Sequence, residues 1–217
     1  MKNIINALLD LLYPPRCPFC RKFIDGKVKL CADCAKSLPY LSDELQGRRL
    51  KNIDACYSAL FYSGSVRDSI HRYKFGNTPA YADCYAELMA DCAEQNDIEC
   101  DIVTWAPLSR SRLRKRGYDQ ALLLAKPVAE HINVPCERLL AKTRNNPAQS
   151  GTKSVRERMS NVSGVYRYAG KSNIAGKTIL LVDDIVTTGA TLGECAEILR
   201  NAGAKRILAL TLACTKD

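Results

Sequence analysis

The clearest hydrophobic pattern in the chain lies near its C-terminus. Residues 179–182 form a continuous apolar run, and two carboxylates, Asp183 and Asp184, follow it directly. A continuous run predicts a strand buried on both faces of a parallel sheet, because a half-exposed strand would alternate apolar and polar residues. We expect the two carboxylates to end the strand where it leaves the core. The small residues 187–191 then lead into a predicted helix over 191–201.

Shorter segments on either side of this run alternate between strand and helix patterns. Val66, Ile70 and Tyr73 recur at helical spacing after Ser65, which can cap a helix. This alternation is typical of an α/β fold with a doubly wound parallel sheet. The other predicted strands are 57–62, 102–105, 134–140, 206–213 and an edge strand over 165–168; the other predicted helices are 79–95, 118–131 and 152–161.

The first residues of the chain also have a helical pattern, with leucine and isoleucine on one face over 1–13. A signal peptide is the alternative interpretation, but Asn3, Asn6 and Asp10 interrupt the run and no small-residue cleavage site follows. We therefore expect a docking helix that ends at Pro14. No stretch of the sequence approaches the length of a transmembrane span.

A polar stretch without periodicity, residues 39–56, is predicted to be a linker. It would separate an N-terminal module over 1–38 from a main domain over 57–217. Within the main domain, residues 57–100 are expected to supply a hood and leading helices. A chain of 217 residues has room for one substantial domain plus a small module of this kind.

Four cysteines of the N-terminal module have the spacing of a metal site: they read CPFC and, after ten residues, CADC. Each CxxC forms a tight knuckle with both thiolates on one side, and two knuckles complete a tetrahedral zinc site. Because four protein ligands leave the metal no open position, we expect structural Zn²⁺ and no catalysis there. A disulfide pair is the alternative. The predicted ligands are Cys17, Cys20, Cys31 and Cys34.

Composition adds two constraints. The formal net charge of +9 and the pI near 9.0 favour anionic partners, either polyphosphate substrates, nucleic acid or both. Basic residues also surround the zinc cysteines. They could form a nucleic-acid-binding face, and the alternative interpretation is that they are ordinary solvated charges. The eleven cysteines are an odd number in an α/β chain, which argues for a reducing, cytoplasmic location. Those outside the zinc site are expected to pack as small hydrophobic residues.

The turn over 187–191 has the composition of a phosphate site. Small residues let backbone amides converge on an anion, the dipole of the following helix favours negative charge, and threonine hydroxyls add donors. Asp183 and Asp184 would repel a phosphate, so we expect them to face sugar hydroxyls or Mg²⁺. A ribose 5-phosphate has both features. The alternative is a core strand followed by a solvated acidic turn.

Two other phosphate motifs do not fit. A P-loop needs GxxxxGK[ST], and although Gly176, Lys177 and Thr178 come close, the first glycine would fall at Lys171. The segment also precedes its strand, whereas a P-loop follows one. No GxGxxG occurs, which argues against a dinucleotide fingerprint.

A dense basic run follows the predicted strand 102–105. Residues 110–116 hold five cations in seven positions, a density that would repel itself without an anion nearby. Ligands of open α/β sheets bind beyond the carboxyl ends of the strands, so a pyrophosphate is a plausible partner for this run. A solvated charge run is the alternative.

The stretch LLVDDIVTTGATL resembles the motif for phosphoribosyl pyrophosphate (PRPP) in type I phosphoribosyltransferases. A four-cysteine ribbon, VRDSIHRYKFG, RKRGYDQ and RERMSNV precede it in this order. Together they resemble the ComF/GntX family of double zinc ribbon, phosphoribosyltransferase-like proteins, some of them linked to competence and DNA uptake. The resemblance covers nearly the whole chain and implies a type I phosphoribosyltransferase-like fold.

The resemblance also implies roles for individual residues. Asp183 and Asp184 would bind the ribose of PRPP, residues 186–191 its 5-phosphate, and Ala106 with Pro107 its pyrophosphate, under a mobile loop around Arg116. The implied catalytic residues are Asp183, Asp184 and Arg116. The implied PRPP-binding residues are Asp183, Asp184, Val186, Thr187, Thr188, Gly189, Ala190, Thr191, Ala106, Pro107, Arg110 and Lys115.

Two departures from the family pattern bear on pyrophosphate. Asp119 stands where RGxNQ is expected, and Trp105 with Ala106 where proline-rich turns are common. Two hypotheses follow. In one, the protein is an enzyme that transfers phosphoribosyl from Mg-PRPP to an unknown acceptor and releases pyrophosphate. In the other, it is a non-catalytic PRPP sensor or a single-stranded DNA-binding protein of the competence machinery. The acceptor cannot be named from the sequence, although 57–75 and the ribbon are expected to form its hood.

Overall fold

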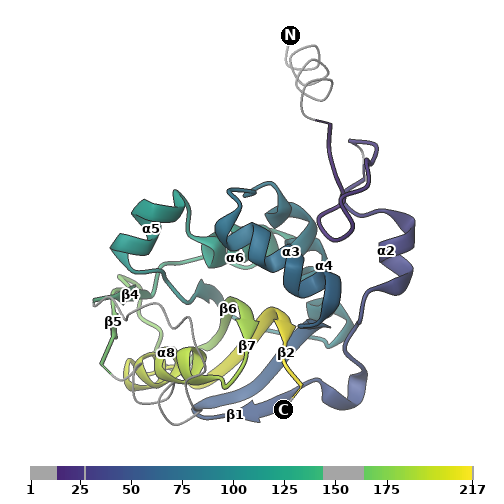
Figure 1. The fold of residues 1–217 in the computed structure, drawn as a ribbon. Helices are drawn as coiled ribbons and strands as arrows, with labels where there is room; N and C mark the ends of the chain where they lie inside the picture. Colours follow the sequence, from purple (N-terminus) through teal and green to yellow (C-terminus); the bar gives the residue numbers. More distant parts are fainter. Residues whose placement is uncertain (1–13, 27, 144–163, 217) are drawn as a thin grey trace.

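The computed structural model describes residues 14–26, 28–143 and 164–216. The predicted docking helix over 1–13 and the predicted helix over 152–161 lie outside these ranges. The main sheet has the order β1-β2-β7-β6-β3, and only β1 runs antiparallel to its neighbour (Figure 1). Its strands are β1 (Arg48–Leu50), β2 (Ile53–Phe61), β7 (Arg206–Cys214), β6 (Thr178–Val186) and β3 (Ile102–Trp105).

Helices cover both faces of the sheet (Figure 1). The alternation of side chains along β6 explains both cores: Leu180 and Val182 pack with the helices of one face, Ile179 and Leu181 with the helix of the other. The first face carries α3 (Gly64–Phe75), α4 (Tyr81–Gln95) and α6 (Gln120–His131); the second carries α8 (Ala190–Asn201). The continuous apolar run thus forms a central strand buried on both sides, as predicted.

Smaller elements surround this core. The strands β4 (Leu140–Lys142) and β5 (Tyr166–Tyr168) form a separate antiparallel pair. The basic run forms helix α5 (Arg110–Arg116), which Ser109 caps and which ends at Gly117 in the left-handed conformation. The N-terminal ribbon carries α2 (Ala32–Ser37), and η1 (Asp43–Leu45) follows it. None of the helices in the described part of the chain is long and apolar enough to cross a membrane.

Three segments differ from the sequence-based expectation. The predicted linker over 39–56 contains η1, β1 and the first residues of β2, so the sheet begins earlier than expected. Residues 134–140 make only a single bridge, between Cys136 and Val103, before β4 begins. Pro135 contributes to this, because it has no amide to donate to a ladder. Finally, β6 continues through the two carboxylates to Val186 instead of ending at them.

Candidate sugar-phosphate site and zinc site

The turn after β6 leaves most of its backbone amides without an acceptor among the described residues. We call residues 187–191 the phosphate turn. Among the described residues, no hydrogen-bond acceptor approaches the amides of Thr187, Thr188, Gly189 or Thr191, and the amide of Ala190 reaches only the Thr188 hydroxyl, at 3.5 Å. Helix α8 begins directly behind them. The turn therefore presents a set of unused donors at a helix N-terminus, the arrangement that binds phosphate.

The shape of this turn depends on Gly189. Its φ of +70° lies in the left-handed region, which favours glycine, and a Cβ built there would lie 3.2 Å from a methyl carbon of Leu50. The segment between β1 and β2 also supports the first turn of α8. Asn52 donates to the Gly193 carbonyl at 3.2 Å, and a Cβ on Gly193 would lie 2.9 Å from the Lys51 carbonyl oxygen. Sequence analysis missed this support because residues 50–52 lie in the predicted linker.

The two carboxylates before the turn occupy opposite faces of the strand, as successive residues of an extended strand must. Asp184 is on the α3 side and only 3% exposed. Its Oδ1 lies 2.8 Å from the Nζ of Lys74, near the C-terminus of α3, and its buried Oδ2 has no hydrogen-bond partner among the described residues. Asp184 is thus an ion-paired carboxylate with one oxygen left over.

Asp183 is half-buried on the α8 side, where its electrostatic neighbours include Lys142. Its Oδ1 accepts a hydrogen bond from the Asp184 amide at 2.8 Å. Burial, and then the charge of Asp184, raise the pKa of Asp183 to about 8. Lys74 pairs with only one of the two adjacent carboxylates, which favours binding of a further cation, and carboxylate oxygens are the ligands that Mg²⁺ prefers.

The turn after β3, residues 106–109, lies at the same edge of the sheet as the phosphate turn, because β3 runs parallel to β6 and their last pair is Trp105 with Val182. We call it the β3 turn. Its amides are already engaged: Ala106 donates to the Val182 carbonyl at 3.0 Å, and Leu108 donates to Asp119 Oδ2 at 3.2 Å. Burial raises the pKa of Asp119. Asp119 thus fixes the β3 turn to the start of α6.

The side chains of the basic run lie on different sides of helix α5. Arg116 donates to the Gln120 side chain at 2.5 Å and lies over the ring of Phe75, 5.3 Å from its centre. Lys115 is exposed. The segment expected to be a mobile loop around Arg116 is helix α5, in which the cations of the last turn favour the negative end of the helix dipole.

A basic groove runs along the other side of α5. It has a volume of about 1090 Å³ and lies between α5, α6 and the β4–β5 pair, with Pro107, Trp105 and Leu122 among its lining residues. A neighbouring hollow of about 530 Å³ extends it to Lys171. The described lining residues include none from the phosphate turn. The cations on the first groove are Arg110, Arg114, Lys126, Arg138, Lys142 and Arg167.

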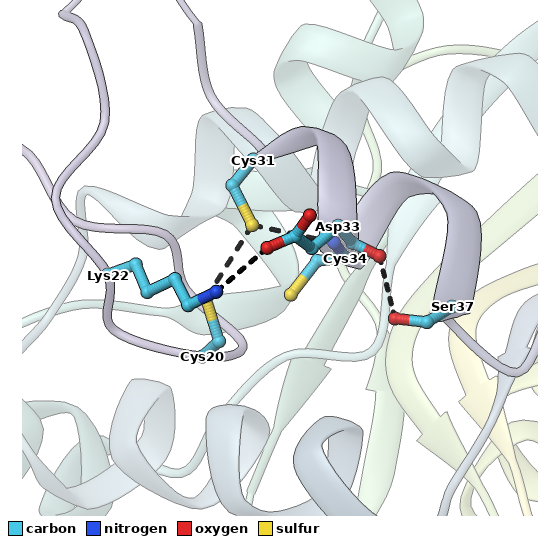
Figure 2. Close-up of polar contacts among 6 residues, drawn as sticks. All are labelled: Cys20, Lys22, Cys31, Asp33, Cys34 and Ser37. Carbon is cyan, nitrogen blue, oxygen red and sulfur yellow. Dashed lines mark hydrogen bonds and ion pairs between the residues drawn. The ribbon is translucent and has the colours of Figure 1, made fainter.

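The four predicted zinc ligands come together in the ribbon. Their sulfur atoms all lie within 4.8 Å of one another, and Cys20 Sγ is 3.6 Å from Cys31 Sγ (Figure 2). Tetrahedral Zn²⁺ with bonds of about 2.3 Å separates its sulfur ligands by about 3.8 Å, so the cluster fits the metal. All eleven cysteines are free of disulfides, which removes the disulfide alternative.

The electrostatics of the cluster also favour a cation. Although burial opposes ionisation, hydrogen bonds from the backbone of the two knuckles lower the pKa of Cys17 to about 7. Burial and the neighbouring thiols raise the pKa of Cys34. Four thiols at this spacing can be ionised together only with a positive charge between them. Nearby, Lys22 pairs with Asp33 at 2.8 Å on the surface (Figure 2).

Two family models match the chain: a double zinc ribbon domain over residues 8–46 and a phosphoribosyl transferase domain over residues 119–216. The chain is 28% identical to competence protein F of Haemophilus influenzae, covering 88% of this chain and 93% of that protein. It is 27% identical to competence protein ComFC of Bacillus subtilis, covering 86% and 72%. A solved structure of glutamine PRPP amidotransferase from B. subtilis matches with a TM-score of 0.44 and 23% identity, covering 64% of this chain and 29% of that one.

Proposed function

We propose that the chain belongs to the ComF family, in which a double zinc ribbon precedes a phosphoribosyltransferase-like domain, and that it binds Mg-PRPP at the end of β6 and transfers the phosphoribosyl group to an acceptor. The observation that carries the proposal is the phosphate turn, which follows two acids of β6 and whose amides lack acceptors among the described residues at the start of α8. No other described turn combines these features with carboxylates on the preceding strand.

In this proposal each group of the site binds a different part of the ligand. Residues 186–191 would hold the 5-phosphate through their amides and hydroxyls. Asp183 and the unpartnered oxygen of Asp184 would accept hydrogen bonds from the ribose hydroxyls. Mg²⁺, brought in with PRPP, would be held by these carboxylates and would neutralise charge on the pyrophosphate.

The pyrophosphate would lie toward the β3 turn, near Ala106, Pro107 and Arg110, with Lys115 and Arg116 on the same helix. A nitrogen nucleophile of the acceptor would form a bond to C1 of the ribose. The bond from C1 to the pyrophosphate oxygen would break, and pyrophosphate would leave with the electron pair. The chain's part would be to hold the reacting groups in line and to stabilise the departing charge, with no covalent intermediate.

Calorimetric titration of Mg-PRPP tests the binding step. We expect the wild-type protein to bind and Asp184→Asn to lose binding. Asp54→Asn is a matched control, because Asp54 pairs with Arg200 at 2.8 Å away from this turn. Unchanged affinity in Asp184→Asn would refute the assignment. Pyrophosphate release with a panel of bases and amines then tests turnover and identifies the acceptor.

A second candidate function is binding of single-stranded DNA, alone or together with PRPP sensing. The basic groove favours it, because its lining combines cations with apolar side chains such as Trp105 and Leu122. The names of the relatives, competence protein F and ComFC, support a role in DNA uptake alongside the competence machinery. Retention of labelled oligonucleotide should fall steeply with salt and weaken in Arg138→Ala. Absence of retention at low salt would remove this candidate.

A further inference from the structure

One helix, α3, contacts both the zinc ribbon and the sugar-phosphate site. In the structure, Ser69 and Arg72 bond to the first zinc knuckle, and Lys74, only two residues further along, pairs with Asp184. The two ends of this connection are far apart in the sequence, at residues 17–20 and 183–191.

At the ribbon end, the contacts go to the backbone between two zinc ligands. The hydroxyl of Ser69, which is fully buried, donates to the Pro18 carbonyl and also bonds to the hydroxyl of Tyr85 at 2.6 Å. Arg72 donates to the Pro18 carbonyl at 2.8 Å and to the Phe19 carbonyl at 3.3 Å. Since Cys17 and Cys20 flank these carbonyls, the conformation that presents them is the one that the metal fixes.

At the other end, Lys74 is held in place and largely withdrawn from solvent. Its side chain is 22% exposed and that of Asp184 is 4% exposed. The last turn of α3 is clamped from the RKRGYDQ segment: the hydroxyl of Tyr118 donates to the Tyr73 carbonyl, and the hydroxyl of Tyr73 donates to the Gln120 carbonyl at 3.0 Å. A buried ion pair held this way leaves one partner strongly destabilised if the other is removed.

We propose that Lys74 is the positioning residue of the sugar-binding acid Asp184, and that the zinc ribbon, through α3, sets where Lys74 stands. Lys74 binds Oδ1 of Asp184 and keeps Oδ2 directed away for the ligand. The expected consequence rests on the proposed function. Whether the ribbon is folded around its metal changes the affinity of the site for the ribose part of a sugar phosphate. Affinity for phosphate alone is not tuned, because the hydrogen bonds and ion pairs described for the last turn of α3 reach Asp184 and the start of α6 and not the phosphate turn.

The first test compares two ligands in Lys74→Met, Lys74→Arg and the control Lys205→Met, whose lysine is exposed after the end of α8. Calorimetry with ribose 5-phosphate in Mg²⁺ should show at least a tenfold loss in Lys74→Met, recovery to within a few-fold in Lys74→Arg, and no change in Lys205→Met. Inorganic phosphate should bind all of them alike. Equal affinity of Lys74→Met and Lys205→Met for ribose 5-phosphate would overturn the role of Lys74.

The second test addresses the ribbon with Arg72→Met, matched by Arg67→Met on the same helix. Among the described residues, the ion-pair partner of Arg67 is its neighbour Asp68. Both variants should retain zinc by metal analysis. Arg72→Met should weaken ribose 5-phosphate binding threefold or more and speed amide exchange at residues 72–75, as zinc removal from the full chain should. Unchanged exchange in both cases would overturn the link. If the wild type binds neither ribose 5-phosphate nor inorganic phosphate, the proposed function fails. The amide-exchange data then still decide whether the ribbon sets the position of Lys74 through α3.

Discussion

Two neighbouring turns at the same edge of the sheet are built in opposite ways. Both follow parallel strands that pair with each other, β6 and β3. In the phosphate turn the amides of Thr187, Thr188, Gly189 and Thr191 have no acceptor among the described residues. In the β3 turn the amides of Ala106 and Leu108 bond to the protein itself, and Pro107 has none to offer. The first turn is ready to bind an anion, whereas the second must rely on side chains.

The two turns would therefore contribute differently to binding of PRPP and to transfer of its phosphoribosyl group. A site that holds a 5-phosphate with backbone donors needs little rearrangement to bind PRPP. Holding and releasing pyrophosphate at the β3 turn would require cations from elsewhere, such as Arg110 of α5, or release of the Leu108 amide from Asp119. The structure therefore supports sugar-phosphate binding more directly than it supports transfer, and substitutions at each turn can test the two separately.

The largest effect is expected from Gly189→Val. A β-branched residue at φ +70° is strained by about 1–2 kcal/mol, and its Cβ would press on Leu50. We expect at least a 100-fold loss of affinity for inorganic phosphate and ribose 5-phosphate in calorimetry, about 2.7 kcal/mol. Gly176→Val is the control, because Gly176 has φ +75° and a Cβ there would meet nothing within 4 Å. Equal losses in both variants would mean that the phosphate turn is not the binding site.

Much of this comparison could be anticipated from local signals. The apolar run of β6, the four zinc cysteines and the strand at 102–105 each depend on neighbours in the sequence, and all were found where predicted. The small residues after Asp184 predicted a turn and helix for the same reason. Local patterns thus identified these elements and the cysteine cluster.

The remainder depends on contacts between distant segments. Nothing near Lys74 in the sequence indicates that it pairs with Asp184, and the three-residue strand β1 carries two arginines and no apolar pattern. The opposite orientation of Asp183 and Asp184 follows from the continuation of β6, which hydropathy could not show because the carboxylates interrupt the apolar run. The sequence likewise does not show that the Leu108 amide donates to Asp119, because the bond forms only when the β3 turn packs against the start of α6.

The next prediction concerns the stability contributed by the acid beside the phosphate turn. The pKa of Asp183 is about 8 in the fold, against 3.8 as the ordinary value, so between these pH values the folded protein keeps a proton that the unfolded chain has lost. Stability from this group is complete below about pH 4 and is lost as the pH rises toward 8, by at most about 1.4 kcal/mol per pH unit. Asp183→Asn should flatten that fall in urea unfolding between pH 5 and 8.

Asp54 provides the opposite sign as a control. Burial opposes its ionisation, but the Ile207 amide and Arg200 outweigh burial and lower its pKa. Its contribution to stability is present above about pH 4 and is lost as the pH falls through its folded pKa. Asp54→Asn should therefore lower stability by a constant amount above about pH 4 and change the pH dependence of unfolding only at acid pH. An unaltered slope above pH 5 in Asp183→Asn would show that Asp183 is ionised in the free protein.

The smallest effect is expected at the β3 turn, from Asp119→Asn. Asparagine still accepts from the Leu108 amide and still caps α6, so stability should change little, whereas Asp119→Ala should cost about 1 kcal/mol through the lost cap. Removing one negative charge beside the turn should strengthen binding of pyrophosphate about threefold without altering inorganic phosphate at the other turn. If pyrophosphate instead bound the wild type as tightly as Asp119→Asn, the charge of Asp119 would not limit the affinity of the β3 turn for pyrophosphate. The contrast with the phosphate turn would then rest on Pro107 and the engaged amides alone.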